Sequence, residues 1–94
     1  MVKATWNETV IAESNDTVVV ENNHYFPLDA VAAGVLTSTA TTSMCGWKGL
    51  ANYYSVTAGG KTNIDAAWYY AEPKSAAANV AGRVAFWKGV KVTA

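Results

Sequence analysis

The chain has few residues that bind metal ions or form covalent cross-links: among its 94 residues there is one Cys and one His. A single Cys cannot form a disulfide within the chain, and a lone thiol is more typical of the reducing cytoplasm than of exported proteins. A structural zinc ion requires three or four Cys, His or carboxylate ligands at suitable spacing. We therefore expect a cytoplasmic protein with no metal centre and no cofactor.

Excess charge and long apolar segments are also missing. Seven Lys and Arg residues balance seven Asp and Glu residues, so the basic surface typical of nucleic-acid-binding proteins is not expected. The longest apolar run, residues 30–36, contains a glycine and is too short to cross a bilayer. Residues 1–6 lack the apolar run of a signal peptide. Neither nucleic acid nor a membrane is a predicted partner.

The balanced charge is unevenly distributed along the chain. Residues 1–31 carry one Lys and five acidic residues, whereas residues 32–94 carry six basic and two acidic residues. Solvated faces of one globule would explain this pattern. So would a weak preference of the second half for anions, or self-association through oppositely charged faces, which leaves a homodimer open.

What the chain does have is a composition typical of β-strands. Valine and threonine outnumber leucine, and 12% of the residues are aromatic, and such side chains fit a pleated surface. The length suits one domain, residues 1–94. Alternation of apolar and polar residues predicts short strands at residues 2–6, 10–13, 17–21, 24–26, 41–44, 51–57, 65–70, 84–87 and 90–92.

Turn residues separate these predicted strands. Asn7-Glu8, Asn22-Asn23 and Gly59-Gly60 predict tight hairpin turns, and the first four strands read as an antiparallel meander. Residues 28–35 predict one irregular helical turn. A helix is predicted near residues 75–81, with Gly82 as its left-handed stop. The predicted fold class is therefore mainly β, a compact antiparallel domain with one short helix.

Several short motifs occur together in this chain. They are Cys-Gly-Trp-Lys-Gly at residues 45–49, Tyr-Tyr-Ser-Val at 53–56, Asp-Ala-Ala-Trp-Tyr-Tyr at 65–70 and Gly-Arg-Val-Ala-Phe-Trp at 82–87. With them the chain resembles the domain-of-unknown-function family numbered 427 over nearly its whole length. The resemblance implies a small β domain similar to the β-tent fold, in which two sheets lean against each other. Some β-tent relatives bind zinc through two Cys-x-x-Cys pairs, and some hold small ligands in an aromatic cage.

The family sometimes carries a nucleotidyltransferase label, which the residues of this chain do not favour. Nucleotidyl transfer needs two or more carboxylates that hold magnesium. The seven acidic residues are dispersed, and Gly59-Gly60-Lys61 lies in a predicted hairpin rather than before a helix. Gly46 stands where the family usually has proline, which predicts a looser loop around the cysteine.

Cys45 and Lys48 are the candidate catalytic pair. A thiolate beside a cation has a lowered pKa and can attack an electrophilic carbon. The alternative is that Cys45 is a small, buried structural residue and that Lys48 caps a carbonyl or faces water. His24, the remaining candidate base, reads as a strand residue.

The aromatic residues allow two interpretations as well. Part of the set must build the core, and the rest could line a concavity suited to flat or cationic molecules. The candidate ligand-binding residues are Trp47, Lys48, Tyr54, Trp68 and Tyr70. By strand parity Trp68 and Tyr70 share one face, and Tyr53 and Tyr54 point to opposite sides.

Three functions remain open from the sequence. The first is a small-molecule-binding module with an aromatic-lined pocket near residues 45–49. The second is a small enzyme in which Cys45 is the nucleophile and Lys48 activates it or holds an anion. The third is a structural or self-associating domain.

Overall fold

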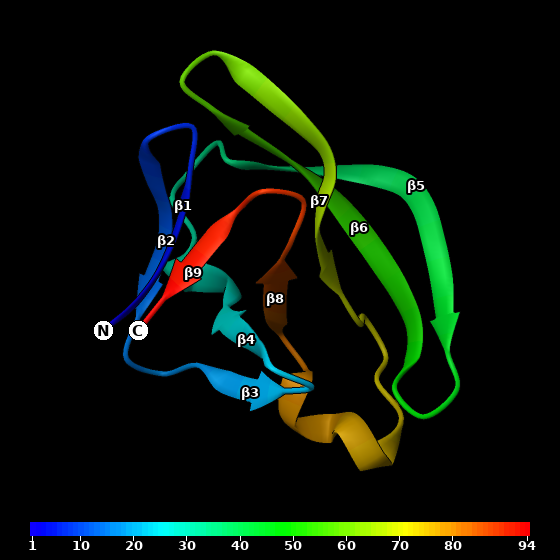
Figure 1. Ribbon diagram of the computed structural model, residues 1–94. Coiled ribbons are helices and arrows are strands. Elements are labelled where there is room, and N and C mark those ends of the chain that lie inside the picture. The colour runs from blue at the N-terminus through cyan, green and yellow to red at the C-terminus, as the bar shows by residue number, and fades with distance from the viewer.

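Nine strands in two antiparallel sheets make up most of the molecule (Figure 1), and the computed structural model describes all residues, 1–94. The small sheet has the strand order β2-β1-β9, with β1 at Val2–Trp6, β2 at Thr9–Ser14 and β9 at Lys91–Thr93. The large sheet has the order β3-β4-β8-β7-β6-β5. Its strands are β3 Val18–Val20, β4 Asn23–Pro27, β5 Leu36–Cys45, β6 Gly49–Ala58, β7 Lys61–Tyr69 and β8 Arg83–Phe86. The predicted mainly β, antiparallel fold is confirmed.

The two central residues of each tight turn have positive φ. Asn7 and Glu8 have φ values of 50° and 59°, and Gly59 and Gly60 have values of 58° and 76°, as two-residue hairpins require. The β3–β4 turn lies one residue earlier than predicted, because residues 21 and 22 take positive φ and Asn23 is already the first residue of β4.

The predicted meander of the first four strands is wrong. β1 pairs with β2 and β3 pairs with β4, but β2 and β3 belong to different sheets. The chain changes direction between them, where the Asp16 N–H donates a hydrogen bond to the Ser14 hydroxyl (2.8 Å). β8 and β9 also belong to different sheets, and β9 returns to pair with β1. Both crossings let the small sheet cover one face of the large sheet.

The two helical segments are short 3₁₀ turns, η1 at Leu28–Ala30 and η2 at Ser75–Val80. The segment η2 is the helix predicted near residues 75–81, and Gly82 follows it with a φ of 71°. The irregular turn predicted for residues 28–35 is confined to η1, and β5 begins at Leu36. No helix in the structure has the length and apolar character needed to span a membrane.

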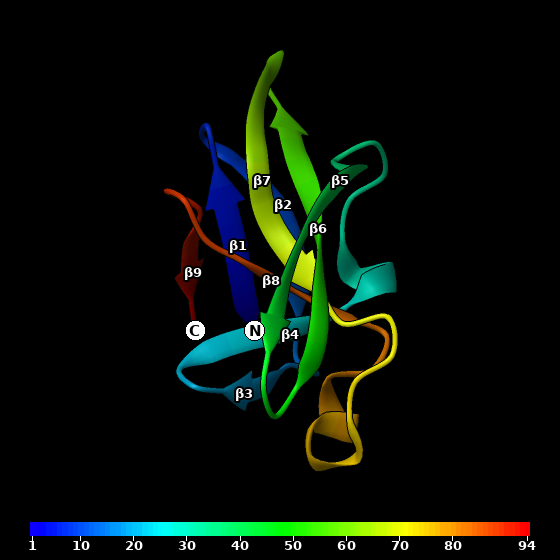
Figure 2. The same ribbon diagram turned by 90° about the vertical axis from the view of Figure 1, so that its right-hand side faces the viewer.

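The large sheet has an apolar cluster on each face, because alternate residues of its strands point to opposite sides. The first cluster lies between the two sheets and contains Ala4, Ile11, Ala12, Phe26, Val35, Val56, Ala58, Ala66, Ala67, Val84 and Phe86. The second lies on the opposite face, beside η2, and contains Tyr25, Ala51, Tyr70, Ala77, Val80 and Ala85. Figure 2 shows the small sheet next to the β6–β7 hairpin, where the Asn7 amide donates to the Ala58 carbonyl (2.9 Å).

Candidate functional site

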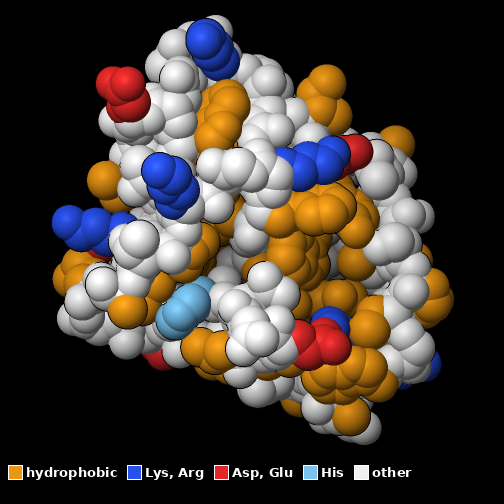
Figure 3. Space-filling view, viewed as in Figure 1, with side chains coloured by type: hydrophobic (Ala, Val, Ile, Leu, Met, Phe, Trp, Pro, Cys, Tyr) orange, Lys and Arg blue, Asp and Glu red, His pale blue; other side chains and the backbone are white.

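The second face of the large sheet is hollowed by a pocket of about 200 Å³, here called the aromatic pocket. Figure 3 shows hydrophobic side chains gathered on this side of the molecule, with acidic and basic side chains at the edges of the patch. Five rings and three polar side chains line the pocket. They are Tyr25, Tyr53, Trp68, Tyr70 and Trp87, with Glu21, Asn23 and Lys48.

Strand register brings the rings together. Tyr53 and Trp68 are direct partners in the β6–β7 pair, and Trp68 is the partner of Ala85 on β8. Directly paired residues point to the same side of a sheet. Because β8 lies between β7 and β4, Tyr25 of β4 reaches the same side. Trp87 follows the last residue of β8 and lies at the edge of the pocket, with 45% of its surface exposed.

The rings pack edge to face and leave a concave surface. Trp68 is nearly perpendicular to both Tyr25 (centroids 6.2 Å apart, 88°) and Trp87 (6.0 Å, 82°). The Trp68 indole N–H donates to the Tyr25 hydroxyl (3.1 Å), and the Trp87 indole N–H donates to the Asp65 carbonyl (2.6 Å). The Tyr53 hydroxyl is hydrogen-bonded to the Ser43 hydroxyl (2.8 Å). These hydrogen bonds fix four of the five rings at their polar edges and make this part of the surface rigid.

A buried cation lies at one side of the pocket. The Lys48 side chain is only 7% exposed, and its ammonium forms an ion pair with the Glu21 carboxylate, which is 58% exposed. The Lys48 Nζ also lies 4.6 Å from the centre of the Trp47 ring and 5.8 Å from that of Tyr70. The alternative of a Lys48 that faces water is therefore wrong: its ammonium lies against the Trp47 and Tyr70 rings, and Glu21 neutralises its charge.

The loop that carries Lys48 is held in place by Lys74. The Lys74 backbone N–H donates to the Lys48 carbonyl (2.9 Å), and the Lys74 ammonium donates to the Gly46 carbonyl (2.8 Å). Gly49 ends the loop with a φ of 115°, and a side chain there would press against the Glu72 carbonyl. These contacts fix the loop despite the glycine at position 46.

Two groups at the pocket keep their protons over a wide pH range. Burial opposes the charge of Lys48 and is the largest single influence, but the hydrogen bond to Glu21 and the neighbouring Tyr70, Cys45 and Tyr25 together outweigh it and raise the pKa of the ammonium above its ordinary value. Burial, followed by the neighbouring Tyr25, raises the pKa of Tyr70 to about 12. At neutral pH the pocket therefore contains a paired ammonium and a neutral phenol.

Cys45 lies beside the pocket rather than in its lining. It is half-buried and packs against the second apolar cluster. The pKa of the Cys45 thiol is lowered, mainly by a hydrogen bond from the backbone N–H of Lys48. The backbone N–H of Trp47 and the charge of Lys48 lower it further, whereas burial opposes these effects. The structure thus places Cys45 near the backbone and the charge of Lys48 but not among the residues that line the hollow.

Tyr54 lies on the face of the large sheet opposite to that of Trp68. It packs against the first apolar cluster and stacks on Tyr69 (centroids 4.6 Å apart, 25°). Burial, together with Tyr69, raises the pKa of its phenol. A second hollow of about 230 Å³ lies on this side, between Tyr54, Tyr69, Leu28 and Arg83, and Tyr70 borders this hollow as well as the aromatic pocket.

Three of the five sequence-predicted ligand-binding residues, Lys48, Trp68 and Tyr70, line the aromatic pocket. Trp47 covers the Lys48 ammonium, and Tyr54 lines only the second hollow, which Tyr70 also borders. Sequence reasoning missed five lining residues: Glu21, Asn23, Tyr25, Tyr53 and Trp87. Tyr53 could have been found, because parity across the Gly59-Gly60 turn places it on the face of Trp68.

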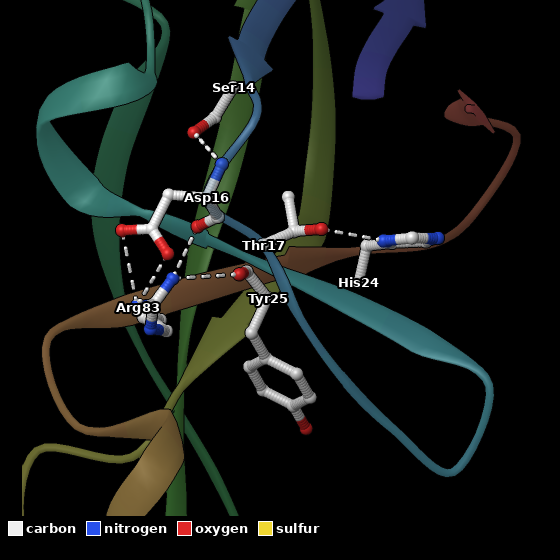
Figure 4. Close-up of polar contacts among 6 residues, drawn as sticks. All are labelled: Ser14, Asp16, Thr17, His24, Tyr25 and Arg83. Carbon is white, nitrogen blue, oxygen red and sulfur yellow. Dashed lines mark hydrogen bonds and ion pairs between the residues drawn. The ribbon is translucent and has the colours of Figure 1, made fainter. Parts of the chain in front are cut away.

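The structure contains no group of three or more His, Cys, Asp or Glu side chains placed to hold a metal ion. His24 lies on β4, where its Nδ1 is hydrogen-bonded to the Thr17 hydroxyl (2.9 Å) (Figure 4). The same figure shows the Tyr25 ring pointing away from Asp16 and Arg83.

Fold and site together define a small, mainly β domain with an aromatic-lined hollow on one face of its larger sheet. The family model described as "Domain of unknown function (DUF427)" matches residues 1–94, so the chain belongs to this family. No curated protein matches the chain at a significant level.

Proposed function

We propose that the chain, as one domain over residues 1–94, binds a flat small molecule in the aromatic pocket. The observation that carries this proposal is the set of five rings from β4, β6, β7 and the β8–β9 connection around an open volume of about 200 Å³. Pockets that bind small molecules are mostly apolar and aromatic, with a few fixed polar groups. Such an arrangement supports a binding role, because Tyr25 and Tyr70 are held in place by burial while Trp87, 45% exposed, still has apolar surface that a ligand ring could cover.

The polar groups at the pocket favour a ligand with hydrogen-bonding edges rather than a bare hydrocarbon. The Tyr70 phenol is neutral at physiological pH and offers both a donor and an acceptor. Asn23 contributes an amide, one N–H of which already reaches the Glu21 carbonyl (3.3 Å). Lys48 and Glu21 add one positive and one negative charge at the same side. We therefore expect a planar ring system that carries a carbonyl or an anionic group.

Tryptophan fluorescence in a metabolite screen tests the proposal. Trp87→Ala removes an exposed wall of the pocket and should weaken a ligand found in the screen by about tenfold, the equivalent of about 1.4 kcal/mol. The matched control is Ile64→Ala, because Ile64 is an exposed apolar residue of β7 that does not line the pocket. Ligands that bind both variants equally well would contradict the proposal.

An enzyme that uses Cys45 as nucleophile and Lys48 as activator is the second candidate. The lowered pKa of the Cys45 thiol favours it. Its position beside rather than in the pocket makes binding without reaction the stronger proposal. Cys45→Ser distinguishes the two: a binding module should keep its affinity for the ligand, whereas an enzyme should lose turnover. A domain that finds no ligand in such a screen would instead be structural or self-associating.

A further inference from the structure

Glu21 and Lys48 form an unequal ion pair at the aromatic pocket. We propose that the natural ligand carries a carboxylate, and that this carboxylate takes the place of Glu21 on the Lys48 ammonium. The inference rests on the proposed function and specifies its ligand: a planar ring for the five aromatic side chains and an anion for the one buried cation.

The first argument is the difference in burial between the partners. Lys48 is 7% exposed and has one carboxylate partner, whereas Glu21 is 58% exposed. A buried ammonium without an anion is strongly unfavourable, while an exposed carboxylate that leaves its partner is hydrated again by water. The pair therefore opens at low cost only if another anion reaches Lys48. The open volume of the pocket lies directly beside both side chains.

The second argument is the way in which the β3–β4 hairpin is attached. β3 is a three-residue edge strand that pairs only with β4, and ion pairs hold both of its ends. Before β3, Arg83 donates to the Asp16 carbonyl (2.6 Å) and to both Asp16 carboxylate oxygens (3.4 and 3.5 Å) (Figure 4). After β3, the Glu21 side chain has Lys48 as its only partner. Release of Glu21 thus frees the turn while the other end of the strand stays attached.

The third argument is the chemistry of the exchange. When a ligand carboxylate replaces Glu21, the Lys48 ammonium still has one anionic partner. One charge-assisted hydrogen bond is exchanged for another. The net free energy of binding then comes from burial of the ligand ring against the aromatic side chains. A neutral ring would gain the same burial but would have to bind with Glu21 still in place. Discrimination between charged and neutral ligands of one shape is therefore the signature of the exchange.

The test uses 2-naphthoate and 2-naphthamide, which share one bicyclic ring and differ in charge. Calorimetric titration at pH 7 compares the wild type with Glu21→Gln, which removes the competing anion. Naphthoate should bind Glu21→Gln about tenfold more tightly than the wild type, and naphthamide should bind the two proteins equally. Glu8→Gln is the matched control, because Glu8 also has positive φ in a hairpin turn but makes no ion pair. It should behave like the wild type.

Lys48→Met provides a second variant should Glu21→Gln fold poorly. It should bind naphthoate no more tightly than naphthamide, because the cation that would hold the carboxylate is gone. Equal gains for both probes in Glu21→Gln, or no gain for naphthoate, would overturn the exchange and leave the pocket itself intact. If neither probe bound to any of the folded proteins, the exchange and the proposed function would both be contradicted.

Discussion

Because Lys48 is buried and Glu21 is exposed, we expect the loss of Glu21 to lower the free energy of unfolding more than the loss of Lys48 does. Lys48 lies under Trp47 and beside Tyr70, with 7% of its side chain exposed, while more than half of Glu21 reaches solvent. Glu21→Gln leaves the ammonium buried without a counter-charge. Lys48→Met removes the charge, keeps an apolar stem of similar length, and returns a carboxylate to water.

The magnitudes follow from the same geometry. In Glu21→Gln the new amide can still accept a hydrogen bond from Lys48, but a neutral acceptor replaces a charged one, so we expect a loss of about 1–3 kcal/mol in the free energy of unfolding. Lys48→Met loses the cation–π contact with Trp47, which contributes about 0.5–1 kcal/mol. The same substitution removes the desolvation cost of the buried ammonium, which offsets this loss. Its net cost should stay below about 1 kcal/mol. In a domain of this size, 1 kcal/mol corresponds to about 4–8 °C in Tm.

Urea denaturation at pH 7 and low salt measures these free energies, with Glu8→Gln as the control for a lost exposed glutamate. The double variant Glu21→Gln with Lys48→Met should be about as stable as Lys48→Met alone, because the glutamate has no further role once the ammonium is gone. The reasoning is refuted if Lys48→Met costs more than Glu21→Gln, or if Glu21→Gln costs no more than Glu8→Gln.

Three further predictions concern single residues. Trp68→Ala should destabilise the domain by about 3–5 kcal/mol, as for other packed aromatics, since Trp68 contacts Tyr25 and Trp87; a Tm within a degree or two of the wild type would show that its ring contributes little to packing. Iodoacetamide should alkylate Cys45 with a pH midpoint below that of an ordinary thiol, and Lys48→Met should raise this midpoint only partly, because the main donor is the Lys48 backbone N–H. Hydrogen bonds from the hydroxyls of Thr39 and Thr41 lower the pKa of Asp65 in the folded state. Stability from Asp65 is therefore complete above its unfolded pKa and lost as pH falls through the lower folded pKa, so Asp65→Asn should destabilise the protein at pH 7 and have little effect at pH 2 in thermal unfolding.

The strands and turns could be predicted from the sequence because they depend on neighbours along the chain. Residues 59 and 60 are both glycine, and the alternation on either side of them predicts the β6–β7 hairpin that the structure contains. The Asn22-Asn23 turn was misplaced by one residue, since Glu21 accepts positive φ there. The side chain of Glu21 explains this choice: from the first turn position it reaches Lys48.

The aromatic pocket could be predicted only in part, because its walls come from distant segments. Parity places Tyr53 with Trp68, and this much is local information. The contact of Trp68 with Tyr25 joins residues 43 positions apart, and it depends on β8 lying between β4 and β7. No periodicity in the chain specifies that strand order. The burial of Lys48 has the same origin, since its partner comes from a hairpin 27 residues away.

The uneven charge along the chain is partly satisfied within the fold. Two of the three ion pairs, Lys48–Glu21 and Arg83–Asp16, join an acid from residues 1–31 to a base from residues 32–94. In both pairs the base is the more buried partner, and in both the acid flanks β3, one before it and one after it. Arg83 of the larger sheet and Lys48 of the β5–β6 loop thus hold the two ends of a short edge strand whose middle residue, Val19, is 56% exposed. Because the acids remain exposed, opening either contact returns a carboxylate to water, and beside the aromatic pocket an anion from solution can take the place of Glu21 on the buried Lys48 ammonium.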